Sequence, residues 1–340
     1  VDYLVLSYVL HERALAPPLI AAGDNLSFFP LGPILRRGGA FFIKRSFRGN
    51  KLYAALVDAY MRKVLASGYP IEFFLEGGRS RTGKLLPPKY GLLSMVIDAA
   101  AKTPLQDVRF VPVSIGYERI VEERSYVHEL GGGEKKEENV GGLLRTPKVL
   151  RSRYGRLYVQ FGEVLSFREL REEFDIQRPK ERRALVQQLA HRVSYQIDRV
   201  TVVTPAALVA STLLVQRRRG VSDTELRGDA AQLAASLQHA KAELASALVD
   251  SEGALRFDTL DEALALFVDA GLVRNTGAQD PTSEWRVPEE RRVALEYYYL
   301  YVFPLLPRPY PRKRGCGSRG SRAGDPLGVR TGAPELRLRV

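Results

Sequence analysis

Residues 70–84 have the sequence PIEFFLEGGRSRTGK and carry the strongest structural and chemical signal in the chain. The first seven residues, 70–76, are mostly apolar or aromatic, which is typical of a buried strand. This strand runs into Glu76, two glycines and a series of arginine and hydroxyl side chains. Glycines let the backbone approach an anion closely, and guanidinium groups donate paired hydrogen bonds to phosphate oxygens. The stretch therefore predicts a strand that ends in an anion-binding turn.

Three other segments have the same character: they are short, aromatic or β-branched, and bounded by glycine, proline or charge, at residues 39–45, 109–115 and 156–162. We interpret each as a strand. Because helical patterns alternate with these strands, the sequence predicts an α/β fold over residues 1–180, a central mixed sheet flanked by helices.

One of the intervening helices has clear start and stop signals. Asn50 is suited to cap a helix, and Gly68 lies just past its expected end. Between them, apolar side chains recur at a spacing of four, namely Leu52, Leu56, Tyr60 and Val64. The pattern predicts a helix that starts after Asn50 and ends before Gly68.

The rest of the chain divides into two parts of different composition. Residues 181–303 repeat Leu and Ala with helical spacing and predict a mainly helical C-terminal region. Residues 304–340 are rich in Pro, Gly and Arg without any period, so we expect a disordered basic tail. The Gly-rich, charged segment 131–142 predicts an exposed loop.

Charge and cysteine content limit the possible function classes. The 340 residues contain 51 Lys and Arg against 39 Asp and Glu, and +7 of the resulting +12 lies in the tail. The small surplus in the remainder suits an enzyme for anionic substrates at an anionic membrane surface. The one cysteine, Cys316, indicates a reducing compartment, and the spacing of the four histidines predicts no metal site. No apolar run of about 18 residues occurs, so no transmembrane helix is predicted.

A second basic pair, Lys44 and Arg45, follows the strand at residues 39–45. If the strands are parallel, their carboxyl ends meet at one edge, where this pair could converge with Glu76 and Arg79 on one phosphate. The alternative is that these cations protect a strand edge against aggregation. Residues 78–84 also come close to a nucleotide-binding P-loop, but Leu85 stands where the Mg²⁺-binding hydroxyl is needed and Pro87–Pro88 prevents the following helix.

The order of these segments resembles the glycerolipid acyltransferase family, most closely its bacterial glycerol-3-phosphate branch, over about residues 1–170. Residues 39–45, GAFFIKR, resemble the family's G-x-[IF]-F-I-[RD]-R block, with Lys44 in place of Arg or Asp. Residues 74–82, FLEGGRSRT, match the F-x-E-G-[TG]-R-S-x-[ST] block at every position. Residues 111–116, VPVSIG, resemble the apolar block in part.

The family's first block, H-x-x-x-x-D, is represented here by Asp2. The resemblance places its histidine, the general base, four residues before Val1, so we expect a segment of a longer protein and little activity from these 340 residues alone. Asp2 and Glu76 are then the expected catalytic residues. The expected ligands of the substrate phosphate are Lys44, Arg45, Gly77, Arg79 and Ser80.

The resemblance implies acyl transfer from acyl-CoA or acyl-carrier protein to the sn-1 hydroxyl of glycerol 3-phosphate, the first step of phospholipid synthesis, with no metal or other cofactor. It also implies peripheral or monotopic attachment to the cytoplasmic side of the inner membrane. Dihydroxyacetone phosphate is the alternative acceptor. A basic nucleic-acid-binding protein is a further alternative, but Tyr310 is the only aromatic residue in the tail that could stack on bases, and we expect no nucleic-acid partner.

Overall fold

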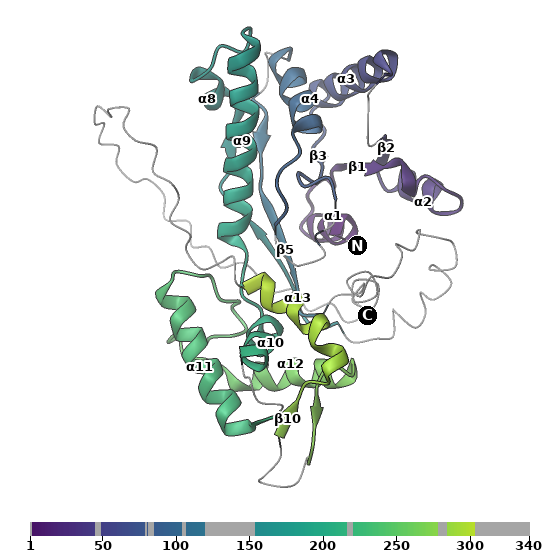
Figure 1. The fold of residues 1–340 in the computed structure, drawn as a ribbon. Coiled ribbons are helices and arrows are strands. Elements are labelled where there is room, and N and C mark those ends of the chain that lie inside the picture. The colour runs from purple at the N-terminus through teal and green to yellow at the C-terminus, as the bar shows by residue number, and fades with distance from the viewer. Residues whose placement is uncertain are drawn as a thin grey trace, which may run out of the picture.

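The structure, a computed structural model, describes residues 2–44, 49–78, 80, 85–103, 107–119, 154–215, 220–277 and 284–302. The segment at 131–142 and the tail at 304–340, predicted to be loop and disorder, lie outside these residues. The described part forms an α/β region followed by a mainly helical region (Figure 1).

A three-stranded parallel sheet forms the N-terminal part of the α/β region. Its order is β2–β1–β3, with bounds β1 Leu19–Gly23, β2 Ala40–Ile43 and β3 Ile71–Glu72. Ile20 pairs with Ala40 on one side and with Glu72 on the other. β2 and β3 confirm predicted strands, although β3 ends at Glu72 and the chain leaves the sheet earlier than expected. β1, with the sequence LIAAG, was not predicted because it is short and rich in Ala and Gly.

The remaining strands of this region form two antiparallel pairs. β4 (Arg109–Phe110) pairs with β7 (Leu165–Ser166), and β5 (Val113–Tyr117) pairs with β6 (Leu157–Phe161). The segment predicted as one strand at 109–115 is therefore divided, since Pro112 has no N–H to donate to a ladder. The described strands lie in separate small sheets, and the chain is mixed α/β, as predicted.

Seven helices accompany these strands in the described part of the α/β region: α1 Asp2–Glu12, η1 Asp24–Leu26, α2 Leu31–Arg37, α3 Lys51–Ala66, α4 Tyr90–Ala101, α8 Phe167–Glu172 and α9 Pro179–Val200. The predicted caps of α3 are confirmed. The Tyr53 N–H donates to Asn50 Oδ1 at 2.9 Å, and Gly68 has a φ of +75°. The face that α3 buries, however, is formed by Val57, Met61 and Val64. Most of the predicted apolar stripe points away from the core.

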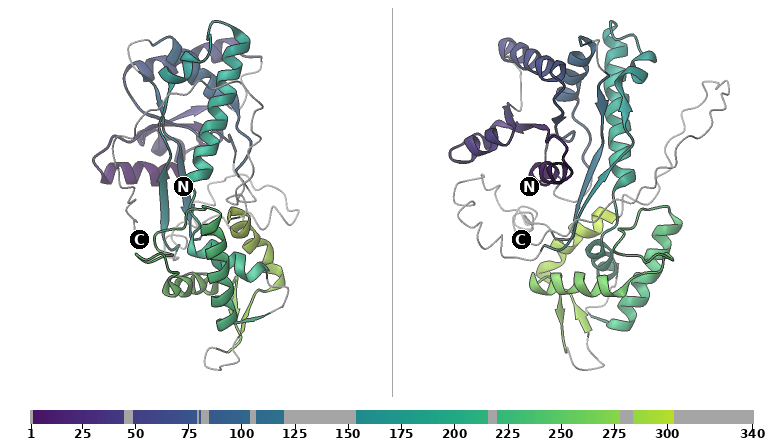
Figure 2. Two further views of the ribbon diagram at one scale, coloured as in Figure 1. Left: turned by 90° about the vertical axis from the view of Figure 1, so that its left-hand side faces the viewer. Right: turned by 180° about the vertical axis from the view of Figure 1, so that it is seen from behind.

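The main core of the α/β region joins α3, α4 and α9. Met61, Ile97, Leu185 and Leu189 have no exposed surface and belong to one cluster. α9 therefore packs with the α/β region and runs along β5 and β6 (Figure 2). The predicted division at residue 180 stays a prediction.

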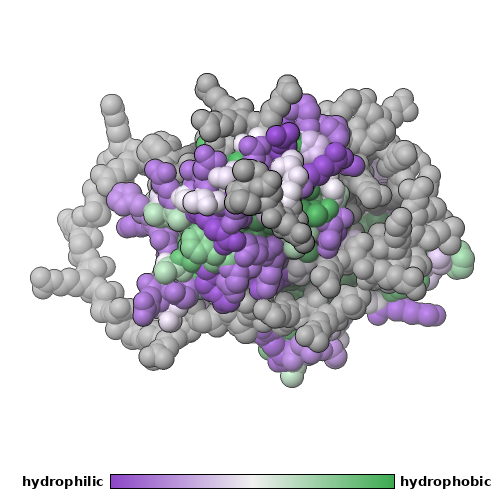
Figure 3. All heavy atoms as spheres, turned by 90° about the horizontal axis from the view of Figure 1, so that it is seen from below, coloured by the Kyte–Doolittle hydropathy of each residue, from purple (hydrophilic) through white to green (hydrophobic). Residues whose placement is uncertain are grey.

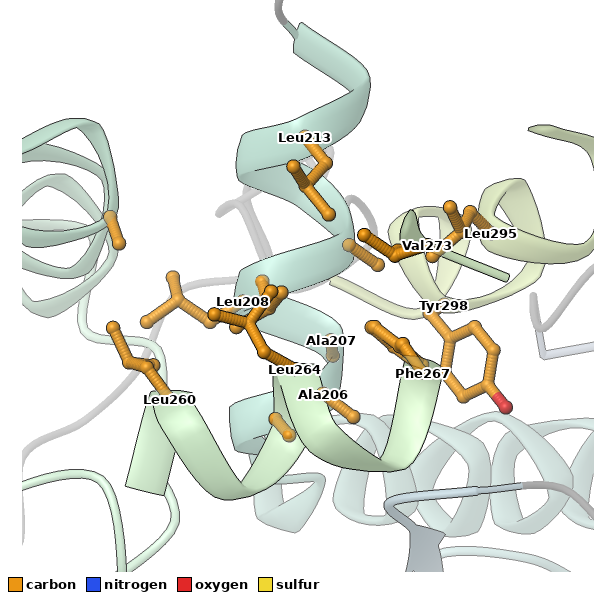
Figure 4. Packing of buried hydrophobic residues seen from close by; sticks show 14 of the residues in the cluster. Ala206, Ala207, Leu208, Leu213, Leu260, Leu264, Phe267, Val273, Leu295 and Tyr298 are labelled. Atoms are coloured by element: carbon orange, nitrogen blue, oxygen red, sulfur yellow. The ribbon is translucent and has the colours of Figure 1, made fainter. Parts of the chain in front are cut away.

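The helical region is built around a single buried helix. α10 (Pro205–Val215) is enclosed by α11 (Asp223–His239), α12 (Phe257–Asp269) and α13 (Arg292–Val302), and all its residues from 205 to 213 are buried. Figure 4 shows Leu208 of α10 beside Leu260 and Leu264 of α12. Three short antiparallel strands, in the order β8–β10–β9, complete the region with η2 Glu289–Arg291: β8 Val221–Ser222, β9 Arg274–Asn275 and β10 Glu284–Arg286.

A buried ion pair joins the two regions. Glu118, only 2% exposed, accepts hydrogen bonds from the Arg156 N–H at 2.9 Å and from the Tyr158 hydroxyl at 3.0 Å. The Arg156 guanidinium lies 3.4 Å from Glu118 Oε1 and 2.6 Å from Glu262 Oε2 on α12. At Gly155, whose φ is +73°, a Cβ would lie 2.2 Å from Glu118 Oε2, so only glycine fits beside this pair.

Among the described residues, no helix combines the length and the apolar character needed to span a bilayer.

Candidate active site

Asp2 is held in place by a residue that lies 115 positions further along the chain. α1 begins at Asp2 and buries Val5, Leu6 and Val9, which fixes the helix against the fold. The Tyr117 hydroxyl, at the end of β5, donates a hydrogen bond of 2.5 Å to Asp2 Oδ1. This hydrogen bond sets the orientation of the carboxylate. Tyr117 was not predicted, because no sequence pattern links a tyrosine after the VSIG segment to the N-terminal helix.

Glu72 is a second carboxylate that sequence reasoning missed. It ends β3, and its Oε2 atom is enclosed without a hydrogen-bond partner in the described part of the chain. Burial, and then the negative charge of Asp2, raise the pKa of Glu72 to about 7. The signal that could have identified it is an acid inside the otherwise apolar run PIEFF.

Glu76 lies in the turn that follows β3. Its Oε2 accepts the Leu86 N–H at 2.8 Å, so the carboxylate closes the loop between β3 and α4. Burial raises the pKa of Glu76, and the charge of Asp2 acts in the same direction. Gly77 has a φ of +57°, and a Cβ there would lie 2.9 Å from Lys89 Cδ. A glycine is therefore required for this turn.

Lys44 and Ser80 are the described candidates that could hold a phosphate through a side chain. Lys44 directly follows β2; its N–H donates to the Tyr53 hydroxyl at 3.2 Å and its ammonium lies 5.4 Å from the centre of the Tyr53 ring. The Ser80 Oγ atom is enclosed and has no hydrogen-bond partner among the residues that the structure describes. A ligand could supply that partner.

The parallel register brings the two predicted segments to one sheet edge. Ala40 and Glu72 lie level with Ile20 in parallel strands, so β2 and β3 run toward the same edge. Lys44 directly follows β2, and Glu76 lies in the turn four residues after the end of β3. Two strand spacings, about 10 Å, separate those strands. The negative charge of Asp2 contributes to the raised pKa of both Glu72 and Glu76. Arg45 and Arg79 lie outside the described residues.

Within the described ranges, no three His, Cys, Asp or Glu side chains are grouped as metal ligands would be.

Replacing Glu72 with glutamine is expected to stabilise the protein above pH 7 but not at pH 5. Because the pKa of Glu72 rises from 4.5 to about 7 on folding, the folded state keeps the proton over that range. Stability of the parent, relative to Glu72→Gln, therefore falls as the pH rises from 4.5 to 7, by about 1–3 kcal/mol for a partly exposed group. Urea unfolding at pH 5 and pH 8 measures this. Glu12→Gln, at the exposed end of α1, is the control, and an equal effect of Glu72→Gln at both pH values would contradict the burial argument.

Comparison with known proteins assigns both parts of the chain. A family model described as Acyltransferase matches residues 1–116, and one described as Glycerol-3-phosphate acyltransferase C-terminal region matches residues 126–299. These matches confirm the resemblance drawn from the sequence blocks.

Three curated relatives from Actinobacillus pleuropneumoniae, of serotype 5b (strain L20), serotype 3 (strain JL03) and serotype 7 (strain AP76), are each named glycerol-3-phosphate acyltransferase. Each is 42% identical over 234 residues, which is 66% of this chain and 28% of the relative. The chain thus spans less than a third of the length of these relatives. Since the C-terminal family model alone covers half of it, the chain belongs to the glycerol-3-phosphate acyltransferase family.

Proposed function

We propose that the protein transfers an acyl group from acyl-CoA or acyl-carrier protein to the sn-1 hydroxyl of glycerol 3-phosphate. The observation that carries this is the Tyr117–Asp2 hydrogen bond, which holds the Asp2 carboxylate near Glu72 and Glu76. β2 and β3 are parallel, so Lys44, which follows β2, and the glycine turn, which follows β3, lie at the same edge of the sheet. An oriented carboxylate near a basic edge suits a phosphate-bearing alcohol that must lose a proton.

In the proposed mechanism, a histidine five positions before Asp2 takes the proton of the sn-1 hydroxyl. The alcohol oxygen attacks the thioester carbonyl, the C–S bond breaks, and the proton passes from the histidine to the departing thiolate. Asp2 stabilises the imidazolium and fixes its tautomer. The thioester itself supplies the activated acyl group, so no metal or other cofactor takes part in the proposal.

The substrate phosphate is proposed to lie against Lys44, Arg45, Arg79, Ser80 and the backbone of Gly77. The enclosed Ser80 hydroxyl supports this, because it has no hydrogen-bond partner among the described residues and can donate to an anion. The Gly77 N–H donates to the Phe74 carbonyl at 3.1 Å, so a phosphate would have to share or replace that bond. Glu76 is proposed to organise the cations or the glycerol hydroxyls.

We also infer that the parallel sheet and the β5–β6 pair belong to one central mixed sheet flanked by helices. Asp2 supports this, because it accepts a hydrogen bond from Tyr117 of β5 and its charge raises the pKa of Glu72 of β3. The product of the proposed reaction is a lipid, so the protein is proposed to attach peripherally to the cytoplasmic side of the inner membrane.

The alternative of a nucleic-acid binder finds little support in the helical region. The sequence of α12 carries Asp258, Asp261, Glu262 and Asp269, and it contains no Lys or Arg. This charge repels phosphate backbones.

The test is an assay of acyl transfer with the chain extended upstream by its natural residues through the motif histidine. We expect 1-acylglycerol 3-phosphate, identified by mass spectrometry, with one thiol released per product, and little product from residues 1–340 alone. Absence of product with the extended chain would refute the function, and equal activity of both chains would refute the H-x-x-x-x-D assignment. A higher kcat/KM for dihydroxyacetone phosphate would select the alternative acceptor.

A further inference from the structure

α3 has two apolar faces on adjacent sides of the helix, and only one of them enters the core. Val57, Met61 and Val64 enter the core, whereas Leu52 is 82% exposed and Leu56 is 64% exposed. Tyr60 follows one turn later and is exposed on one side, while its ring contacts Phe41 on the other. We call Leu52, Leu56 and Tyr60 the α3 outer face. A surface helix ordinarily carries polar residues on its exposed sides, so this face lacks the polar side chains that are expected there.

Single exposed leucines are common on protein surfaces, but three large apolar side chains at successive i, i+4 positions form a continuous stripe. The residues between them on that side, Ala55 and Ala59, are small, apolar and exposed. The stripe therefore extends over about two and a half helical turns without a charge inside it.

The neighbouring part of the α/β region repeats this combination of exposed apolar and basic residues. Phe29, 81% exposed, and Ile34 lie at the start of α2 and on it, beside the exposed Arg36 and Arg37. α2 and α3 project on the side of the α/β region opposite α9 (Figures 1 and 2).

Charge identifies the kind of partner. Residues 31–66 contain eight Lys and Arg and one acid, Asp58, so they carry +7, more than the net charge of the whole chain without its tail. Asp58 is itself paired with Arg62 at 3.1 Å. Lys51 and Lys63 are exposed near the two ends of the α3 outer face. Apolar side chains between cations fit an anionic lipid surface, in which the leucines enter the acyl boundary and the lysines meet headgroup phosphates.

We propose that the α3 outer face, with the basic residues around it, is the surface by which this protein docks on an anionic bilayer. This rests on the proposed function only in that a lipid product calls for a membrane, and lipid binding can be measured without any acyl transfer. The face of the helical region in Figure 3 is mostly hydrophilic where it is described, with small apolar areas, and makes a poorer lipid contact.

The position of α3 connects this surface to the candidate active site. Tyr53, in the first turn of α3, contacts Lys44 through the hydrogen bond and ring contact described above. Tyr60 packs against Phe41 of β2 with ring centres 5.1 Å apart. A bilayer under the α3 outer face would thus lie within a few helical turns of the sheet edge, where an acyl chain must be delivered and released.

The first test is sedimentation of the 340-residue chain with vesicles of phosphatidylcholine containing 30% phosphatidylglycerol. Leu52→Ser/Leu56→Ser is expected to lower the partition coefficient at least about tenfold, since removing one inserted leucine costs roughly that factor. Val164→Ser/Val268→Ser, at exposed positions on other elements, is the matched control and should leave it unchanged. Because all chains keep the basic tail, the comparison is repeated at about 0.5 M salt, where headgroup attraction is screened and apolar insertion persists.

A second measurement locates the contact directly. With Cys316 replaced by serine, Leu52→Cys is labelled with an environment-sensitive fluorophore. We expect a blue shift when anionic vesicles are added, and none for Val164→Cys. Lys51→Gln/Lys63→Gln should lose most of its preference for anionic over neutral vesicles while keeping its fold by circular dichroism.

Equal partition of Leu52→Ser/Leu56→Ser and the parent would overturn the proposal. So would a parent that binds no vesicles but forms a dimer that the same variant dissociates, because the α3 outer face would then belong to a second copy. Failure of acyl transfer in the extended chain, with vesicle binding intact, would refute the proposed function and leave this surface standing.

Discussion

Arg156→Met is expected to destabilise the protein by about 3–5 kcal/mol, the cost of leaving a buried charge without its partner. Glu118 is almost completely buried and receives the Arg156 guanidinium, the Arg156 N–H and the Tyr158 hydroxyl. Burial already raises the pKa of Glu118, which shows that desolvation outweighs these favourable contacts. Without the guanidinium, Glu118 must take up a proton or remain charged in an apolar site, and Glu262 loses its partner as well. Chemical unfolding at pH 7 measures the difference.

Two controls separate this effect from the loss of an ordinary surface ion pair. Arg227→Met removes a more exposed cation that pairs with Asp223 and with Asp261, each at 2.6 Å, and should cost no more than about 1 kcal/mol per pair. Combining Arg156→Met with Glu118→Gln should recover part of the loss, because the neutral amide needs no countercharge. A loss for Arg156→Met no larger than that for Arg227→Met would contradict the buried-charge argument.

Asp2→Asn is expected to lower kcat about 10²–10⁴-fold in the chain extended through the motif histidine, the usual range for general-base work. The amide retains the shape of the carboxylate but neither stabilises the imidazolium nor fixes the tautomer in the same way. The KM for glycerol 3-phosphate should change little, because the proposed phosphate ligands lie on other elements. Steady-state kinetics with acyl-CoA measures both parameters.

Tyr117→Phe provides a graded comparison within the same prediction. It removes the hydrogen bond to Asp2 Oδ1 but retains the ring, so kcat should fall less than with Asp2→Asn. Tyr69→Phe, at an exposed position before β3, is the control and should retain parent kinetics. If Asp2→Asn kept the kcat of an active extended parent, Asp2 would not belong to the catalytic machinery.

Local signals made some parts of the fold predictable. The Asn50 cap and Gly68 defined α3 because capping depends on a few neighbouring residues. The same sequence could not tell which side of α3 faces the core, since both sides are apolar. β1 was not predicted because its sequence, LIAAG, has few of the β-branched or aromatic residues that favour a strand. The segment becomes a strand through its pairing with β2 and β3.

The candidate site likewise contains residues that local sequence predicts and residues that it does not. Glu76 and Gly77 were predicted because a strand, a carboxylate and a glycine turn follow one another in sequence. Glu72 and Tyr117 were missed because their importance depends on Asp2, which is distant in sequence and close in space. Burial and electrostatic coupling of this kind are tertiary properties, and no local motif encodes them.

The enclosed position of α10 has a consequence for the newly made chain on the ribosome. α10 ends at Val215, but α13, which covers one side of it, begins only at Arg292, about 80 residues later. At the usual rate of synthesis, about 5–20 residues per second, roughly 4–16 s pass before that cover emerges. During this interval the side of α10 that α13 covers stays open to water, although α11 and α12 have already emerged.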